Sequence, residues 1–96
     1  QENPKAAQAA EILDCATKND LPGSLGQIQG GVIAIDLSTD DETILLHVLD
    51  SDAEAADYDT GLQLDQEPVA NVVIIGGAID DDHRATVRSC IEDSAA

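Results

Sequence analysis

Residues 69–75 read VANVVII and are followed by Gly76 and Gly77, and this stretch decides the fold class. Apolar residues occupy both of the faces that alternate along it, which is typical of a strand buried on both sides. Val and Ile favour strands because branched side chains pack well on a pleated surface. We therefore predict that residues 69–75 form a central strand and that the two glycines end it.

The residues upstream of this strand predict a β-hairpin over 31–50. Apolar residues alternate along 32–37 and again along 44–49, which is the period of a half-buried strand. The residues between them, 39–42, read TDDE and are typical of a polar turn. The two strands of this hairpin would pair antiparallel in the same sheet as residues 69–75.

Helices are predicted at both ends of the chain. Asn3 followed by Pro4 is a helix-start signal, and small residues then recur at helical spacing as far as residue 18. Near the other end, residues 80–82 are three aspartates, which cap a helix and complement its dipole. The face of this final helix carries Val87, Cys90 and Ile91.

A short helix over 52–58 and a brief edge strand complete the predicted elements. Ser51 and Glu54 are three residues apart, as in a capping box, where each side chain accepts a hydrogen bond from the other residue's amide. Leu62 and Leu64 are assigned to the edge strand. The fold class is therefore α+β, a small two-layer α/β sandwich of one domain over residues 1–96. Its antiparallel sheet has three to four strands, and the N- and C-terminal helices pack on one face.

Cys15 and Cys90 are the two cysteines of the chain, and we expect them to form one disulfide. In the predicted layer the first and last helices lie side by side, which brings the two residues together. The alternative is a pair of unrelated buried thiols in a reducing cytosol. The Gln1 start and the absence of Met favour a mature secreted protein, so we expect an extracellular location.

The composition is strongly acidic. Twenty Asp and Glu residues stand against four Lys and Arg residues, which gives a formal net charge of −16. Such a surface repels phosphates, so nucleic acids and anionic membranes are excluded as partners, and no stretch is apolar enough for a membrane span. A protein partner with a basic surface is expected instead.

Asp59-Thr60-Gly61 resembles the active-site signature of the aspartic proteases, and the chain length is similar to that of one subunit of the dimeric retroviral type. The resemblance covers this triplet and implies a homodimer in which Asp59 shares a proton with its symmetry mate and activates water. The chain departs from the family because polar residues, including Asp57, precede the triplet where a hydrophobic strand is expected. A turn also accounts for the three residues.

Asp36, Asp40 and Glu42 repeat at even spacing, as the first ligands of a calcium loop would. The loop pattern fails at its sixth position, where Asp41 replaces glycine, and at its twelfth, where His47 replaces glutamate. The three residues remain candidates for loose cation binding only, and the sequence predicts neither a metal site nor a cofactor.

These observations favour a small, acidic, secreted and disulfide-stabilised protein that acts by recognising another protein, as an effector, toxin or inhibitor does. No catalytic residues are assigned. Two alternatives remain: a salt-adapted accessory or binding domain from a halophile, since carboxylates keep a chain hydrated in brine, and a homodimeric aspartic protease that uses the triplet at 59–61.

Overall fold

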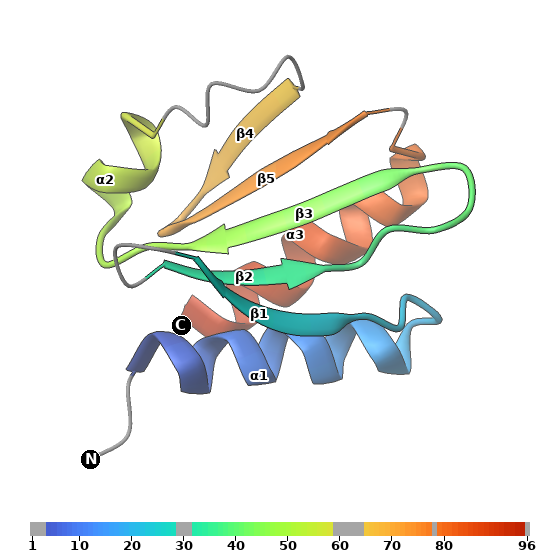
Figure 1. The fold of residues 1–96 in the computed structure, drawn as a ribbon, viewed down its shortest axis with the longest axis horizontal. Helices are drawn as coiled ribbons and strands as arrows, with labels where there is room; N and C mark the ends of the chain where they lie inside the picture. The colour runs from blue at the N-terminus through green and yellow to red at the C-terminus, as the bar shows by residue number, and fades with distance from the viewer. Residues whose placement is uncertain (1–3, 29–31, 59–64, 78, 96) are drawn as a thin grey trace.

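Five antiparallel strands form one sheet in the order β1-β2-β3-β5-β4, and two long helices lie against it (Figure 1). The computed structural model describes residues 4–28, 32–58, 65–77 and 79–95. In chain order the elements are α1 (Pro4–Lys18), β1 (Ser24–Ile28), β2 (Val32–Asp36), β3 (Thr43–Val48), α2 (Asp52–Ala56), β4 (Asp65–Val69), β5 (Val72–Gly77) and α3 (Asp81–Ala95).

The α+β class, the antiparallel sheet and the pair of terminal helices on one face are confirmed. The sheet has five strands where the sequence predicted three to four. The additional strand is β1, which pairs with β2 from Ser24 opposite Asp36 to Ile28 opposite Val32. Its sequence, SLGQI, has no regular alternation of apolar residues, so its strand structure depends on that pairing.

The central strand predicted over residues 69–75 is displaced. Val69 ends β4, Ala70 and Asn71 form a two-residue turn, and β5 begins at residue 72. Ala70 has a φ of +52°, in the left-handed region that glycine occupies at low cost. The sequence pattern therefore does not indicate this hairpin turn, because neither of its two residues is a glycine or a proline.

Gly76 and Gly77 are the last two residues of β5, so the strand includes the two glycines at which it was predicted to end. Gly76 pairs with Ile44, and a Cβ on this glycine would lie 2.2 Å from the carbonyl oxygen of Thr43. The glycine thus permits a close approach of β3. The edge strand next to β5 is β4, over residues 65–69, whereas the predicted one at Leu62 and Leu64 lies outside the described residues.

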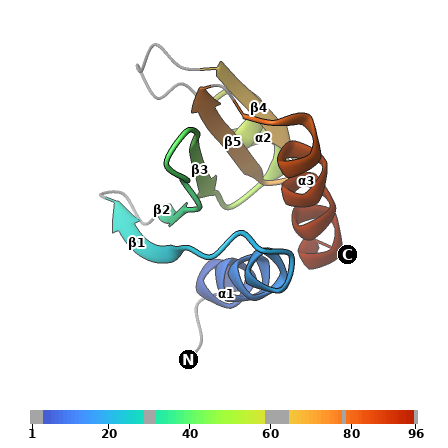
Figure 2. The same cartoon turned by 90° about the vertical axis from the view of Figure 1, so that its right-hand side faces the viewer.

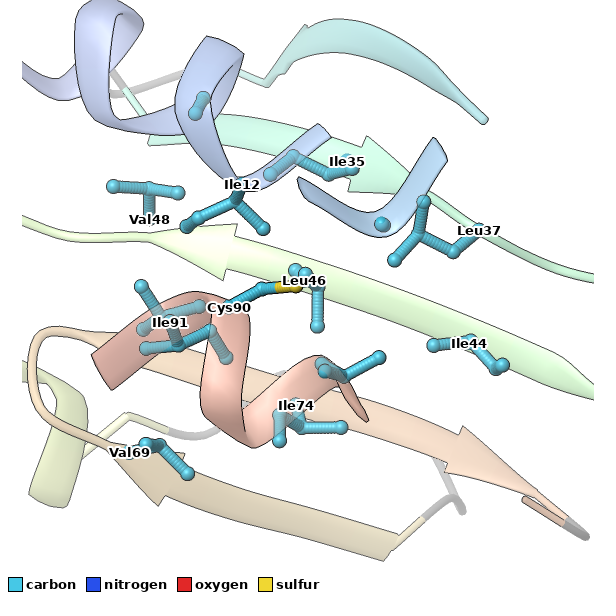
Figure 3. Packing of buried hydrophobic residues seen from close by; sticks show 14 of the residues in the cluster. Ile12, Ile35, Leu37, Ile44, Leu46, Val48, Val69, Ile74, Cys90 and Ile91 are labelled. Atoms are coloured by element: carbon cyan, nitrogen blue, oxygen red, sulfur yellow. The ribbon is translucent and has the colours of Figure 1, made fainter. Parts of the chain in front are cut away.

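The main core lies between the sheet and the pair α1 and α3, which run side by side (Figures 1 and 2). Ile and Leu side chains of β2 and β3 point towards Ile12 of α1 and Ile91 of α3, with Ile74 of β5 beside them (Figure 3). Each of these three isoleucines is at most 1% exposed. None of the helices in the described part of the chain is long and apolar enough to cross a membrane.

The predicted disulfide between Cys15 and Cys90 is present and joins α1 to α3. The two Cα atoms are 5.7 Å apart, although the residues are 75 positions apart in the sequence. Neither cysteine is left as a free thiol. The bridge therefore ties the two ends of the chain together across one face of the sheet.

A pair of amide side chains ties the same helices to the β4–β5 turn. Asn71 Nδ2 donates to Gln8 Oε1 at 2.8 Å, and Gln8 Nε2 donates back to Asn71 Oδ1 at 2.9 Å. Gln8 Nε2 also lies 3.3 Å from the hydroxyl of Ser94 in α3. Asn71 Nδ2 donates in addition to the carbonyl of Leu49, at 2.8 Å, so this turn is held from several sides.

Replacing Ala70 with glycine is expected to stabilise the fold by about 0.5–1 kcal/mol, because glycine adopts a positive φ without the steric cost that alanine incurs. Chemical unfolding of Ala70→Gly and wild type measures the difference. Ala85→Gly, at an exposed position inside α3, is the control and should destabilise by about 1 kcal/mol. A loss of stability in Ala70→Gly would contradict this account of the turn.

Removing the bridge in the double variant Cys15→Ser/Cys90→Ser is expected to cost about 4 kcal/mol, since a cross-link over 75 positions restricts the unfolded chain strongly. Urea unfolding of the variant and of the oxidised wild type gives the value. Wild type unfolded in the presence of a reductant serves as the matched control and should unfold at the urea concentration of the variant. Equal stability of the oxidised and reduced proteins would contradict the prediction.

Candidate functional site

The face of the sheet turned away from α1 and α3 carries a second apolar cluster. Side chains alternate along β5, so that Ile74 joins the main core while Val73 and Ile75 point to this second face. Ala55 of α2 and Leu49, which follows β3, pack against them. The sheet is thus buried on both faces at β5, as its apolar sequence indicates.

A hollow of about 490 Å³ opens on this face, and we call it the second-face hollow. It lies between β2 and α2, and its lining consists of apolar residues and two carboxylates: Val32, Leu49, Ala53, Tyr58, Glu54 and Asp57. The chain leaves β3, turns at residues 49–51 and enters α2, which places α2 beside the hollow. The hollow therefore combines apolar surface with acidic groups.

The start of α2 is fixed by a cap that differs in part from the predicted one. The hydroxyl oxygen of Ser51 accepts a hydrogen bond from the amide of Glu54 at 3.2 Å, as expected. The carboxylate of Glu54 accepts from the amide of Asp50 at 3.3 Å, one residue before the predicted donor Ser51. This contact holds the Glu54 carboxylate at the first turn of α2.

Tyr58 contacts His47 of β3 next to the hollow. His47 Nδ1 lies 2.8 Å from the Tyr58 hydroxyl, and the two rings meet edge to face with centroids 5.5 Å apart. Gln66 Nε2 of β4 donates to the Tyr58 carbonyl at 2.9 Å and fixes its backbone. Burial lowers the pKa of His47, so this imidazole is neutral at pH 7.

This face combines the imidazole of His47 and the phenol of Tyr58 with apolar side chains. Among the described residues, His47 hydrogen-bonds to Tyr58 and to no serine, cysteine or carboxylate, so no nucleophile is paired with it. No group of three or more potential metal ligands converges anywhere in the described segments. What the second-face hollow offers is an apolar contact surface beside negative charge.

Each of the four basic residues of the chain is engaged in an ion pair with a carboxylate that does not line the hollow. Lys5 binds Asp50 at 3.0 Å and Lys18 binds Asp14 at 3.0 Å, while Arg84 and Arg88 both contact Glu67 of β4. No salt bridge within the described residues involves Glu54 or Asp57. Negative charge at the hollow is therefore available to a cation from outside the molecule.

The three candidates for cation binding have separate roles in the structure. Asp36 Oδ1 accepts from the amide of Ser38 at 2.9 Å, and Asp40 is exposed in the β2–β3 turn. Glu42 points to the start of α3, where its carboxylate accepts from the amide of Asp80 at 2.7 Å and from His83 Nδ1 at 2.8 Å. The structure does not bring the three carboxylates together.

The contact between Glu42 and His83 joins the β2–β3 turn to α3, and we call it the turn clamp. The hydrogen bond to Glu42 raises the pKa of His83. The hydrogen bond from the Asp80 amide, followed by that from His83, lowers the pKa of Glu42. Both shifts favour the charged pair, which gives His83 a structural role in this fold.

The protease-like triplet Asp59-Thr60-Gly61 lies outside the described residues, so its arrangement stays a prediction. The sequence did not predict the contact between His47 and Tyr58 or the second-face hollow beside it. The signals available were the position of His47 on the less apolar side of its strand and the status of Tyr58 as the single aromatic residue. Neither signal predicts that the two side chains meet, because they come together only through the path of the chain from β3 into α2.

The two histidines are expected to give opposite pH dependences of stability. His83 has a raised pKa in the fold, so its contribution is full below the unfolded value of about 6.5 and is lost as pH rises through the raised value. The melting temperature of wild type relative to His83→Gln should therefore increase as pH falls from about 8.5 to about 6, a range in which Glu42 is ionised.

His47 provides the comparison with the opposite sign. Its pKa is lowered, so its contribution is present above about 6.5 and is lost as pH falls through the lowered value. The melting temperature of wild type relative to His47→Leu should therefore be constant above about pH 6.5 and should decrease as pH falls below it. If the difference in melting temperature between wild type and variant changed with pH in the same direction for both variants, the assignment of the turn clamp and of the buried imidazole would be contradicted.

Comparison of the chain with protein-family models, with curated proteins and with solved structures found no significant match.

Proposed function

We propose that this protein is a non-catalytic recognition protein that binds a basic protein partner at the second-face hollow. The observation that carries the proposal is the composition of the hollow, whose apolar lining adjoins the carboxylates of Glu54 and Asp57. The partner segment that fits it presents one apolar side chain with Lys or Arg beside it.

The apolar part of the hollow supplies affinity. Val32, Leu49 and Tyr58 come from three different segments and line an open hollow of about 490 Å³, which is wide enough for an aliphatic or aromatic side chain. Burying one such side chain contributes about 1.5–3 kcal/mol. Tyr58 is anchored by His47 and Gln66, so the wall that it forms is ordered before a partner arrives.

The net negative charge of the molecule favours association with a basic partner. The chain carries −16 overall, and its four basic residues are engaged in ion pairs with carboxylates that do not line the hollow. A basic partner is attracted at long range and gains contacts with Glu54 and Asp57 when it docks. Screening by salt weakens both effects, so binding should be sensitive to ionic strength.

The bridge between Cys15 and Cys90 supports an oxidising compartment, and we place the protein outside the cell as a secreted effector, toxin-like factor or inhibitor. Intact-mass analysis of protein purified without reductant tests this part. Reduction should add the mass of two hydrogen atoms. Two free thiols in the native protein would contradict the proposed extracellular location. They would not bear on binding at the second-face hollow, which has its own test.

Binding is tested with a synthetic peptide that has a central leucine between lysines, by titration calorimetry at low and at high salt. Wild type should bind, and affinity should fall as salt rises. Ala53→Lys places a long basic side chain at the hollow, and affinity should fall by about tenfold or more, as expected when one buried apolar contact is lost.

Ala85→Lys makes the same change of residue and charge at an exposed position of α3 and is the matched control. It should retain wild-type affinity within about twofold. A second peptide, with glutamates in place of the lysines, should not bind. Equal loss of affinity in both variants, or binding that is indifferent to salt, would overturn the assignment of the hollow.

A further inference from the structure

The two edges of the sheet differ in a way that bears on association. β4 forms one edge and contains Asp65, Glu67 and Pro68, and charged residues and proline are the devices that keep edge strands from pairing. β1 forms the other edge, and its sequence SLGQI contains no charged residue and no proline. Among the described residues no strand lies on its outer side. β1 therefore presents an unprotected row of backbone donors and acceptors.

Apolar surface is exposed on the same strand. Leu25 is 47% exposed and is the one exposed large hydrophobic side chain in the described part of the chain. It lies opposite Ile35 on the helix side of the sheet, and with Ala6 and Ile33 it lines an apolar hollow of about 370 Å³. A Cβ added to Gly26 would meet no atom within 4 Å beyond its own chain neighbours, so the face of β1 is open at this residue.

The charge distribution identifies the occupant. The chain has 20 acidic residues, and none of them is in β1. A basic segment would find no carboxylate on this strand, whereas a second copy of the chain brings an identical uncharged strand. Pairing along β1 brings together two strands without carboxylates, whereas pairing along the other edge strand, β4, would place Asp65 and Glu67 of one copy against those of the other.

We infer that two copies of this chain pair through β1 in antiparallel register and join their sheets into one continuous sheet across a two-fold axis. This arrangement is isologous, because each copy contributes the same strand. With the axis at Gly26, the two Leu25 side chains occupy diagonal positions on the helix side of the joined sheet, within reach of each other. The inference is independent of the proposed function, since β1 contributes no residue to the second-face hollow.

Sedimentation equilibrium of the full chain over micromolar to millimolar concentrations tests the inference. The mean mass should rise from that of one chain towards that of two, and the dimer should become stronger with added salt, because salt screens the repulsion between two chains of −16 each. This salt dependence is opposite in sign to that of peptide binding at the second-face hollow. The two proposals can therefore fail separately.

Leu25→Glu places a carboxylate on each copy at the joined edge and should weaken association by at least about tenfold, while circular dichroism should show an unchanged fold because the side chain is already half exposed. Ala85→Glu makes the same addition of charge on α3 and should dimerise as wild type does.

Hydrogen exchange of wild type at low and at high concentration gives a second readout. Amides of β1 should gain protection on association, and those of β4 should not. A chain that stays monomeric at millimolar concentration and high salt would overturn the inference. So would a dimer that Leu25→Glu leaves intact, or protection that appears elsewhere.

Discussion

The rest of the structure depends on the covalent link between the first and the last helix. A chain with a net charge of −16 and 96 residues has little apolar surface with which to oppose the repulsion of its carboxylates. The bridge from Cys15 to Cys90 reduces the freedom of the unfolded chain and holds α1 beside α3. Both helices then cover the same face of the sheet, so α2 and the second-face hollow occupy the other.

The charged residues divide into two groups with different roles. The few cations stabilise the fold: Lys5 joins α1 to Asp50, and two arginines of α3 hold Glu67 on β4. Several acids also serve the backbone, as Asp80 does when its carboxylate accepts from the amide at the second position of α3. Within the described residues, no such cation pairs with Glu54 or Asp57 beside the second-face hollow, and these two acids carry the electrostatic part of the proposed function.

Much of the fold could be predicted from local patterns. The hairpin of β2 and β3 and the two long helices follow from apolar periodicity, and the cysteine pairing follows from the expected packing of those helices. The turn at Ala70 was missed because an alanine with a positive φ has no sequence signature. The second-face hollow was missed as well, since His47 and Tyr58 meet only after the chain has crossed through α2.

The sequence by itself determined the helices, the hairpin strands and the sign of the surface charge, because these depend on neighbouring residues or on composition alone. Only the tertiary structure decided that SLGQI is an edge strand and that Val69 and Val72 face each other across a turn. The tertiary structure also decided which face of the sheet is left uncovered by α1 and α3. The physical reason is that strand pairing and burial are set by segments distant in the chain, and a local pattern contains no record of those partners.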